Sequence, residues 1–387
     1  MTAGRLVVVG GGVIGCAVAL AAREQFAEIV IVEQRADLGL AASGAAIGGI
    51  TPQSDDFCRG PLRIVAEASR AMYRGWLDDI ESLSGVTVPY LDTGLLQVAL
   101  SVTEEMRLRE GLVPEWRAQG FTVEDVDLAD LRRDEPLLSP EVVCAFRLPS
   151  EGALEPRVLM RALGAAIDRT STITVRTGQR VDEVRPTATG VIVRLGQEQI
   201  TADKCVVSAG AWSADLVPGI SEAVFPVRGQ AAEFRVPGAV TYPFRHHVYA
   251  KAKLEEVSHS AYIVPRSDGR VIAGVTYDEQ RWDEEPTAES SSVIIKSLLA
   301  LVPSASGWEP LSEWAGIRPA TVDGCPLVGY VDNSQRRLVI ATGHFGVGIT
   351  LAPVTGQLVA ALLSDEPLSE ETQKILRTTD PSRLMSG

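Results

Sequence analysis

The sequence contains little cysteine and histidine. Its 387 residues include five cysteines and four histidines, and no two cysteines form a C-x-x-C pair. Scattered cysteines argue against a disulfide framework and against a thiolate metal site. His246 and His247 are adjacent, but no histidine spacing is typical of a metal site. We therefore expect a cytoplasmic protein with reduced thiols and without a structural metal.

Positive charge is also scarce. The chain has 36 Lys and Arg against 50 Asp and Glu, a formal net charge of -14. Such a surface repels polyanions, so we expect neither a nucleic acid nor a membrane as partner. The first residues lack the basic start, apolar stretch and cleavage site of an export signal, and we expect no membrane span. The sequence leaves open whether the protein forms a homo-oligomer.

A strand, a glycine-rich turn and a helix open the chain. The segment "RLVVVGGGVIGCAVALAAREQFAEIVIVEQ" begins with a β-branched run, continues with small and apolar residues at helical spacing, and ends in a second β-branched run. This pattern predicts strands at 5–9 and 28–33 and a helix over about 12–25. Together they form a βαβ unit.

The glycines of this turn match a dinucleotide-binding motif. Gly10, Gly12 and Gly15 form G-x-G-x-x-G, in which the tight turn, the approach of a pyrophosphate and the helix packing each require a missing side chain. Glu33 ends the second strand, 18 positions after Gly15, where it can accept hydrogen bonds from a ribose diol. An acid there disfavours the 2′-phosphate of NADP. NAD, FAD and a packed turn without a ligand stay open at this point.

Two further segments favour FAD over NAD. Residues 39–52, "GLAASGAAIGGITP", consist almost entirely of Gly, Ala and Ser, which suits a backbone that runs closely along an extended ligand. Residues 341–363 predict a strand, a glycine-rich turn and a final helix that starts near Gly348. The positive end of that helix would stabilise a reduced, anionic flavin ring. A simple C-terminal capping helix is the alternative.

Helical stretches and segments rich in short strands alternate along the sequence, which indicates interleaved domains. A long amphipathic helix is expected over 61–82 and a proline-started helix in "EGALEPRVLMRALGAAI". Segments rich in short strands alternate with these helical parts. The predicted boundaries are an FAD-binding domain at 1–85, 150–220 and 311–365, a substrate domain at 86–149 and 221–310, and a loosely held C-terminal tail at 366–387.

Seven segments, taken in order, resemble the glycine oxidase and D-amino-acid oxidase flavoenzymes, most specifically the glycine oxidase branch. They are "VVVGGGVIGCAVAL", "EGALEPRVLMRAL", "VVSAGAWSADL", "FPVRGQ", "YIVPRSDGRVIAGVTY", "WAGIRPATVDGCPLVG" and "ATGHFGVGITLAP". The resemblance implies an α/β fold: a Rossmann-like FAD-binding domain interleaved with an α+β substrate domain that carries a large antiparallel sheet. It also implies non-covalent FAD. Monomeric sarcosine oxidase, in the same family, tethers its flavin through a cysteine in the stretch equivalent to "WAGIRPATVD", and this chain has none there.

The resemblance also implies which residues hold the cofactor. They come from the first turn, the Gly/Ala segment, the middle of the chain and the C-terminal glycine-rich loop. The set is Gly10, Gly12, Val13, Ile14, Gly15, Glu33, Gln34, Ser43, Ala46, Ile47, Gly48, Val181, Gly210, Trp212, Gly343, His344, Phe345, Gly346, Gly348 and Ile349.

Two residues are implied to hold the substrate. Arg318, in "GIRPATVDG", matches the arginine that binds the substrate carboxylate in glycine oxidases, because a planar guanidinium offers two parallel donors and keeps its charge. A structural salt bridge is the alternative. Tyr262 matches a tyrosine whose hydroxyl helps to hold that carboxylate, although a core tyrosine would read the same way. We expect Arg266 to form a structural ion pair.

Three departures from the family pattern bear on the substrate. Glycine oxidases commonly carry a methionine at the position of Gly49, an Arg-Asn pair at Gly346 and Val347, and an apolar residue at Tyr277. We count Gly49, Gly346 and Tyr277 with the catalytic site and expect the two glycines to enlarge it. A small ligand in an enlarged pocket is poorly oriented, which favours a substrate bulkier than glycine. The alternative is that Tyr277 and other residues refill the space.

The resulting hypothesis is an FAD-dependent oxidase of an amino acid or an N-substituted glycine. Hydride passes from Cα to flavin N5, the imine hydrolyses, and molecular oxygen becomes hydrogen peroxide. For a glycine unit the products are glyoxylate and an amine, and no strong protein base is expected. Three alternatives stay open: a plain glycine oxidase of thiamine synthesis, an amino-acid dehydrogenase with another electron acceptor, and a flavin-binding protein without turnover.

Overall fold

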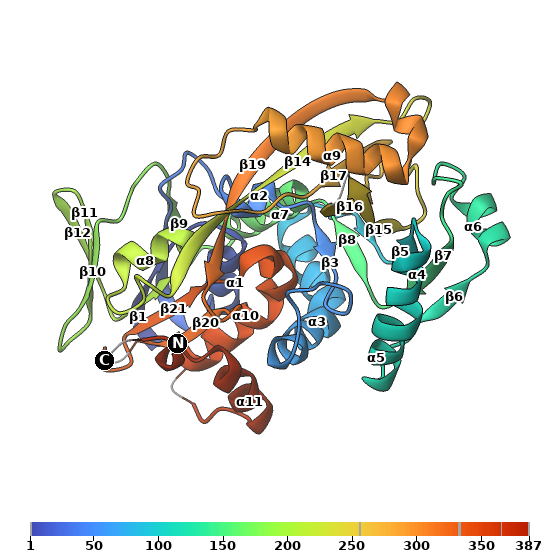
Figure 1. Cartoon of the computed structure of the whole chain (residues 1–387). Helices are drawn as coiled ribbons and strands as arrows, with labels where there is room; N and C mark the ends of the chain where they lie inside the picture. Colours follow the sequence, from blue (N-terminus) through green and yellow to red (C-terminus); the bar gives the residue numbers. More distant parts are fainter. Residues whose placement is uncertain (1, 255–256, 332–333, 365, 386–387) are drawn as a thin grey trace.

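A six-stranded sheet contains the N-terminal strand (Figure 1). The computed structural model describes residues 2–254, 257–331, 334–364 and 366–385. All neighbouring strands in this sheet are parallel except the outermost pair, β20 and β21. In spatial order the strands are β20 (Leu327–Tyr330), β21 (Leu338–Thr342), β13 (Lys204–Val207), β1 (Thr2–Val9), β2 (Phe26–Val32) and β9 (Ile173–Arg176). Their apolar side chains are buried on both faces, as is usual for parallel strands.

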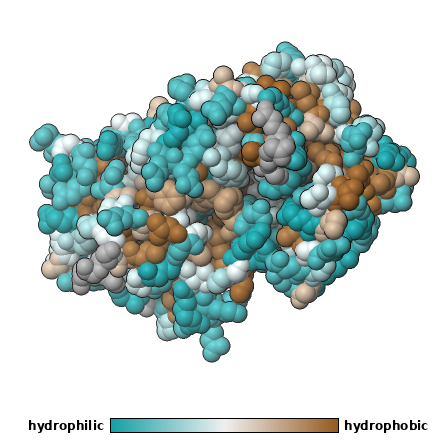
Figure 2. All heavy atoms as spheres, viewed as in Figure 1, coloured by the Kyte–Doolittle hydropathy of each residue, from teal (hydrophilic) through white to brown (hydrophobic). Residues whose placement is uncertain are grey.

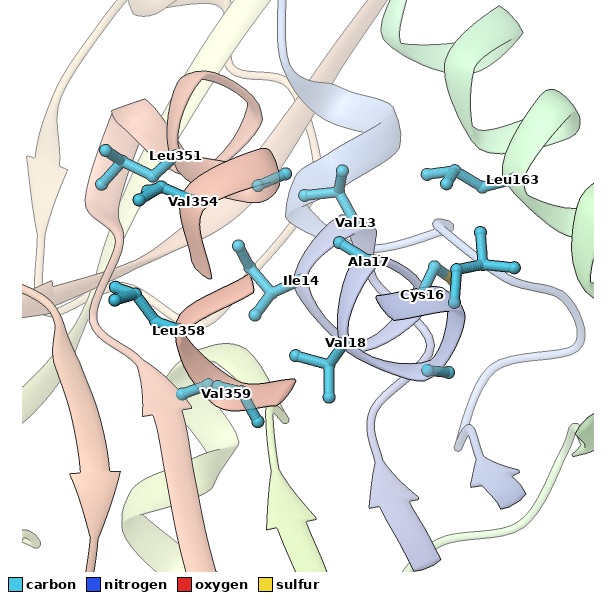
Figure 3. Close-up of a cluster of buried hydrophobic side chains, with 14 of the residues drawn as sticks. Val13, Ile14, Cys16, Ala17, Val18, Leu163, Leu351, Val354, Leu358 and Val359 are labelled. Carbon is cyan, nitrogen blue, oxygen red and sulfur yellow. The ribbon is translucent and has the colours of Figure 1, made fainter. Parts of the chain in front are cut away.

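Four helices pack against one another beside this sheet: α1 (Val13–Ala21), α3 (Pro61–Ser84), α7 (Pro156–Asp168) and α10 (Gly348–Leu363). In Figure 3 the side chains of Val13 and Ile14 on α1 lie between Leu351 and Val354 of α10 and Leu163 of α7. The two helices α1 and α10 approach closely, since a Cβ atom on Gly356 of α10 would lie 2.9 Å from a backbone oxygen of α1. This contact holds the middles of the two helices against each other.

The apolar character of α10 follows from its burial. The stretch Phe345–Leu363 is long and apolar enough to cross a membrane, but 78% of its apolar window is buried inside the fold. It is therefore explained as a core helix. Figure 2 shows hydrophilic residues over most of the visible face, with separate hydrophobic patches between them.

A second, nine-stranded sheet is antiparallel except where β15 pairs with β5. Its strands are β18 (Asp278–Glu279), β14 (Val224–Arg235), β17 (Arg270–Gly274), β16 (Val257–Pro265), β15 (His247–Leu254), β5 (Leu95–Ala99), β7 (Cys144–Leu148) and β6 (Glu124–Val126), with β19 (Glu309–Thr321) paired to β14. Helix α9 (Ala288–Leu301) contacts β14, β15, β16 and β17. The helical segments α4 (Val102–Met106), η1 (Arg107–Leu112), α5 (Val113–Ala118) and α6 (Leu128–Asp134) lie at the β5 to β7 end (Figure 1).

Smaller elements lie between the strands of the two large sheets along the chain. Strands β10 (Glu183–Pro186), β11 (Val191–Leu195) and β12 (Glu198–Ala202) form a separate three-stranded sheet. A second small sheet joins β3 (Gly49–Ile50), β8 (Gly152–Leu154) and β4 (Tyr90–Leu91). The short helical turns α2 (Ala42–Ala45), η2 (Gly210–Trp212), α8 (Ser213–Leu216), η3 (Pro303–Gly307) and η4 (Phe345–Val347) lie in connecting segments.

The expected elements are present, with shifted ends. The first helix stops at Ala21 instead of residue 25, and α3 continues to Ser84, where Gly85 takes the left-handed conformation that ends the helix. The mixed α/β architecture confirms the predicted fold class. The division into domains stays a prediction. Most of β19, from residue 311 on, falls in the predicted FAD-binding range 311–365, although β19 pairs along its length with β14 of the predicted substrate domain.

The C-terminal segment is held more firmly than expected. Helix α11 (Glu370–Thr379) buries Ile375 against α3 and β20, and η5 (Pro381–Arg383) follows it. Arg383 forms an ion pair with Asp323 at 2.6 Å and donates to the carbonyl oxygens of Cys325 and Pro326. The expectation of a loosely held tail is therefore wrong for residues 366–385, and residues 386–387 lie outside the described part.

Candidate active site

One long cleft collects the predicted site residues. The cleft has a volume of about 340 Å³. Its walls come from both large sheets, the first glycine-rich turn and the start of α10. Every predicted catalytic residue lines it, and so does every predicted cofactor residue except Gly15 and Gly343. Those two glycines shape turns behind the wall.

The first turn is closed too tightly for side chains. A Cβ atom on Gly15 would lie 1.9 Å from the carbonyl oxygen of Gly10, and Gly10 itself has φ +106° with its Cβ position 2.4 Å from the carbonyl oxygen of Ser208. Gly12 precedes α1 and provides no side-chain cap. Ser43 accepts a hydrogen bond from the Val13 N–H at 2.9 Å. The free N–H groups at this helix start face a cleft, which favours a phosphate there.

Glu33 lies at the end of β2 with most of its surface buried. One carboxylate oxygen accepts the Gly11 N–H and the other accepts the Arg35 N–H, each at 2.7 Å. Each oxygen can accept a second hydrogen bond. Glu33 thus keeps capacity for a ribose diol, and Gln34 and Val181 line the same end of the cleft.

The Gly/Ala segment forms one wall of the cleft and is fixed from outside. Trp314 donates to the carbonyl oxygen of Ala45 at 2.9 Å, and Arg266 donates to that of Ile47 at 2.7 Å and to that of Leu154 at 3.1 Å. Arg266 is buried and structural as expected, but among the described residues it holds backbone carbonyls and forms no ion pair. The ion pair that we expected for it is therefore wrong.

The C-terminal loop forms the opposite wall. Gly343 has φ +77°, and a Cβ atom there would lie 2.4 Å from a methyl group of Thr321. His344 is buried with Nε2 3.1 Å from the hydroxyl oxygen of Thr355, and burial lowers its pKa to about 3, so its ring is neutral. Phe345 has φ +45°, and α10 begins at Gly348 without a side-chain cap or an acidic residue in its first turn. A second uncapped helix start therefore meets the cleft.

Arg318 is the basic group at the centre of the other end. It projects from β19, and the structure gives it one hydrogen bond, from Nη1 to the Thr276 carbonyl oxygen at 3.0 Å. Its guanidinium lies 4.8 Å from the ring centre of Tyr277 and 5.9 Å from that of Phe345. Among the described residues it has no carboxylate partner, so the predicted alternative of a structural salt bridge finds no support there. Its remaining N–H groups are available to a ligand carboxylate.

Gly229 makes the position of Arg318 possible. It lies on β14, and a Cβ atom on Gly229 would come within 1.9 to 2.2 Å of the Nη1, Nη2 and Cζ atoms of Arg318. The sequence analysis included this glycine in a matched segment but gave it no role. The signal was a glycine inside a long strand, which often marks close approach of another group.

Tyr262 reaches the cleft wall at Gly49. A Cβ atom on Gly49 would lie 2.2 Å from the Tyr262 hydroxyl oxygen, which also lies 2.8 Å from Nδ1 of His247. Burial raises the pKa of Tyr262 and lowers that of His247 to about 3, so both groups are neutral. The expectation that Gly49 enlarges the pocket is wrong, because the tyrosine hydroxyl occupies the space.

Gly346 behaves differently from Gly49. A Cβ atom there would meet Arg318 at 3.8 Å, an ordinary contact. Beside it, Phe57 lies 4.5 Å from the ring of Phe345 and 5.5 Å from that of Tyr277, between ring centres. Phe57 and Tyr277 are 42% and 46% exposed. The mouth of the cleft is thus made of aromatic rings around Arg318.

Sequence analysis missed several residues of this mouth. Asp55 and Phe57 lie on the loop after the Gly/Ala segment. Tyr249 and Lys251 lie on β15, where Tyr249 pairs with Tyr262 and Lys251 with Ser260 of β16. Their signal was weak: residues 249 and 251 alternate along one strand face, as any half-buried strand would show. Tyr249 and Ser260 are joined by a hydrogen bond of 3.0 Å.

The cleft fits FAD. Two helix starts whose N-cap residues provide no side-chain cap, the acidic residue Glu33 and a wall of Gly and Ala residues line one cleft. No cysteine lines the described part of this space, which agrees with non-covalent binding. Within the described ranges no three His, Cys, Asp or Glu side chains are grouped as for a metal ion.

Comparisons with known proteins agree with this geometry. The bifunctional protein ThiO/ThiG of Synechocystis sp. is 29% identical over 99% of this chain, which spans about half (56%) of that relative's length. The glycine oxidase of Geobacillus kaustophilus is 29% identical, with 92% of each chain covered. Its crystal structure superposes with a TM-score of 0.85 at 28% identity, covering 95% of this chain and 96% of the other.

The family assignment rests on most of the chain. The model of the DAO family, described as FAD dependent oxidoreductase, matches residues 5–362. This range holds both glycine-rich walls, Glu33 and Arg318. The chain is a member of the DAO family of FAD dependent oxidoreductases.

Proposed function

We propose that this chain oxidises the Cα–N bond of an amino acid or an N-substituted glycine that is bulkier than glycine. The observation that carries the proposal is Arg318, a positive group without a carboxylate partner among the described residues, in the same cleft as the nucleotide turn. A guanidinium in this setting binds a carboxylate with two parallel hydrogen bonds. FAD, when bound, would supply the hydride acceptor for this oxidation, and we assign molecular oxygen as the final electron acceptor, with hydrogen peroxide as the product.

The chain's residues orient the substrate. Arg318 holds the carboxylate, and the Tyr262 hydroxyl closes the wall at Gly49 and leaves little space beside it. The substituent then extends toward Phe57 and Tyr277 at the mouth, where exposed rings favour an apolar arm. After oxidation water hydrolyses the imine, so a glycine unit leaves as glyoxylate and the rest as an amine.

A plain glycine oxidase is the second candidate. It is favoured by the glycine oxidase of Geobacillus kaustophilus, and the ThiO part of the Synechocystis relative suggests thiamine synthesis as its setting. An amino-acid dehydrogenase that uses another electron acceptor is the third. The aromatic mouth favours the bulkier substrate over free glycine.

A substrate panel separates these candidates. Peroxide release is measured in air for glycine, sarcosine, several D-amino acids and N-carboxymethyl amines with longer apolar arms. The proposal expects kcat/KM to rise with the arm and to exceed that of glycine about tenfold or more, since each buried CH₂ contributes about 0.8 kcal/mol. Equal or better activity with glycine would favour the plain glycine oxidase. Anaerobic bleaching of the flavin without peroxide release in air would indicate the dehydrogenase.

A further inference from the structure

An acidic side chain lies in the cleft opposite the basic one. Asp55 lines the same space as Arg318, on the loop that follows the Gly/Ala segment. One of its carboxylate oxygens accepts the Phe57 N–H at 2.9 Å. Among the described residues no Lys, Arg or His forms a salt bridge with Asp55. Lys251 and Asp56 also line this cleft and lie 3.9 Å apart, so Arg318 and Asp55 are the cation and the anion at the mouth that have no ion-pair partner among the described residues.

The loop that carries Asp55 is held in place by hydrogen bonds to Glu151. The buried carboxylate of Glu151 accepts the N–H groups of Gln53 and Ser54 at 2.9 and 2.7 Å and the Ser54 hydroxyl at 2.7 Å. The Asp55 N–H donates to the Thr51 carbonyl oxygen at 3.0 Å. These bonds make Asp55 a positioned group.

The charge of Asp55 reaches the substrate end of the cleft. It acts on the ionisation of Arg318 and Tyr262, which were predicted from the family resemblance, and of Tyr277, which departs from the family pattern. The pKa of Asp55 is raised to about 6, chiefly by burial and to a smaller extent by the charge of Asp56. The Phe57 N–H, Arg318 and Arg63 oppose this shift. Glu151 and the thiol of Cys58 complete the titratable groups around it.

We infer that Asp55 binds the protonated amine of the substrate and accepts its proton before oxidation. This inference rests on the proposed function. Amino acids carry a carboxylate and an ammonium group, and the cleft offers one partner for each. In the step, an N–H bond breaks and leaves its electron pair on nitrogen, while an O–H bond forms on Asp55. The free lone pair can then assist loss of hydride from Cα, and the proton leaves to solvent through the open mouth.

The proton transfer becomes easier inside the cleft than in water. Burial disfavours charge on both partners, so it lowers the pKa of an ammonium group and raises that of a carboxyl group. The two values approach each other. Asp55 is ionised above about pH 6 and is then ready to accept.

The test compares pH profiles of kcat/KM for wild type, Asp55→Asn and Asp55→Glu, with Asp79→Asn, an exposed aspartate of α3 that does not line the cleft, as the matched control. For Asp55→Asn we expect a loss of roughly 100-fold at pH 7, within the range for general acid–base groups. The loss should shrink to about threefold at pH 10, because the amine is then already deprotonated in water. Asp55→Glu should recover part of the rate. A loss that is equal at all pH values would overturn the inference.

A binding measurement separates this inference from the proposed function. Betaine has a fixed positive charge and cannot be oxidised by this route, and 3,3-dimethylbutanoate is its uncharged-arm isostere. Their affinities are read from the visible spectrum of the bound flavin at pH 8. Wild type should prefer betaine about fivefold, and Asp55→Asn should lose that preference. If no amine in the panel is oxidised, the proposed function fails, and the betaine preference still decides whether Asp55 holds a cation.

Discussion

Replacement of Gly229 by alanine tests how the arginine is placed. Gly229 of β14 pairs with Gly316 of β19, two residues before Arg318. An added Cβ atom would lie 1.9 Å from Nη1, 2.1 Å from Nη2 and 2.2 Å from Cζ of Arg318. These atoms are the flexible end of a long side chain, so the guanidinium moves and the strands stay in place. Gly229→Ala therefore displaces the charge without removing it.

The magnitude follows from the contacts that are lost. A hydrogen bond to a charged group contributes about 1.5–3 kcal/mol, and a displaced guanidinium cannot keep both parallel bonds to a carboxylate. A loss of about 2–4 kcal/mol corresponds to a decrease of kcat/KM of roughly 30-fold to 700-fold. The free energy of unfolding should change by less than about 1 kcal/mol, because alanine in a strand offsets part of the cost of the displacement.

The assay measures kcat/KM with the best substrate of the panel, together with the flavin spectrum and urea unfolding. Gly75→Ala is the control, because a Cβ atom at Gly75 meets nothing within 4 Å. The double variant Gly229→Ala with Arg318→Ala should be no slower than Arg318→Ala alone, since both changes affect one interaction. The reasoning is refuted if Gly229→Ala keeps kcat/KM within threefold of wild type, or if the double variant is much slower than the single one.

Three further predictions concern the walls of the site. Gly49→Ala should destabilise the fold by about 1–3 kcal/mol because of the contact with the Tyr262 hydroxyl, and in urea unfolding the addition of Tyr262→Phe should recover part of that loss. The pKa of His344 is lowered to about 3, so below about pH 6.5 the unfolded state binds a proton that the native state does not. The free energy of unfolding therefore falls as the pH drops. In urea unfolding, His344→Gln should recover about 2 kcal/mol at pH 5 relative to its effect at pH 7.5. Buried Arg228 forms ion pairs with Asp278 at 2.8 Å and with Asp283 at 3.3 Å. Arg228→Lys should weaken these contacts and loosen residues 278–283. Tryptic cleavage at exposed Arg281, followed by mass spectrometry, should then become about tenfold faster.

The cofactor end could be predicted because its signals are local. A strand, a turn without side chains and a helix follow one another within a few residues, and each glycine has a steric reason that is visible in the spacing. Gly10, Gly12 and Glu33 are such residues, and the structure places all three on one cleft. The prediction of FAD came from two more local patterns, the Gly/Ala segment and the start of α10.

The substrate end could be predicted only in part, because its residues meet through strand pairing. Arg318 and Tyr262 were found by resemblance, and the structure places both on the cleft. Gly49 shows why composition alone misled: a glycine leaves room only if no neighbour fills it, and the Tyr262 hydroxyl comes from a strand more than 200 residues later. The contact between Gly49 and the Tyr262 hydroxyl cannot be predicted from the sequence pattern.

The same reasoning explains why the acidic group was missed. Asp55 lies in a loop with no regular period, so nothing in its surroundings separates it from an ordinary surface aspartate. It becomes a candidate because Glu151, almost 100 residues away, fixes the loop, and because Arg318 from β19 faces the same cleft. The opposite charges of Asp55 and Arg318 on one cleft are a property of the fold, since the loop after the Gly/Ala segment brings one of them and β19 brings the other. Substrate recognition in this chain therefore depends on long-range contacts, whereas cofactor recognition depends on short ones, and variants at the two ends should separate flavin binding from amine oxidation.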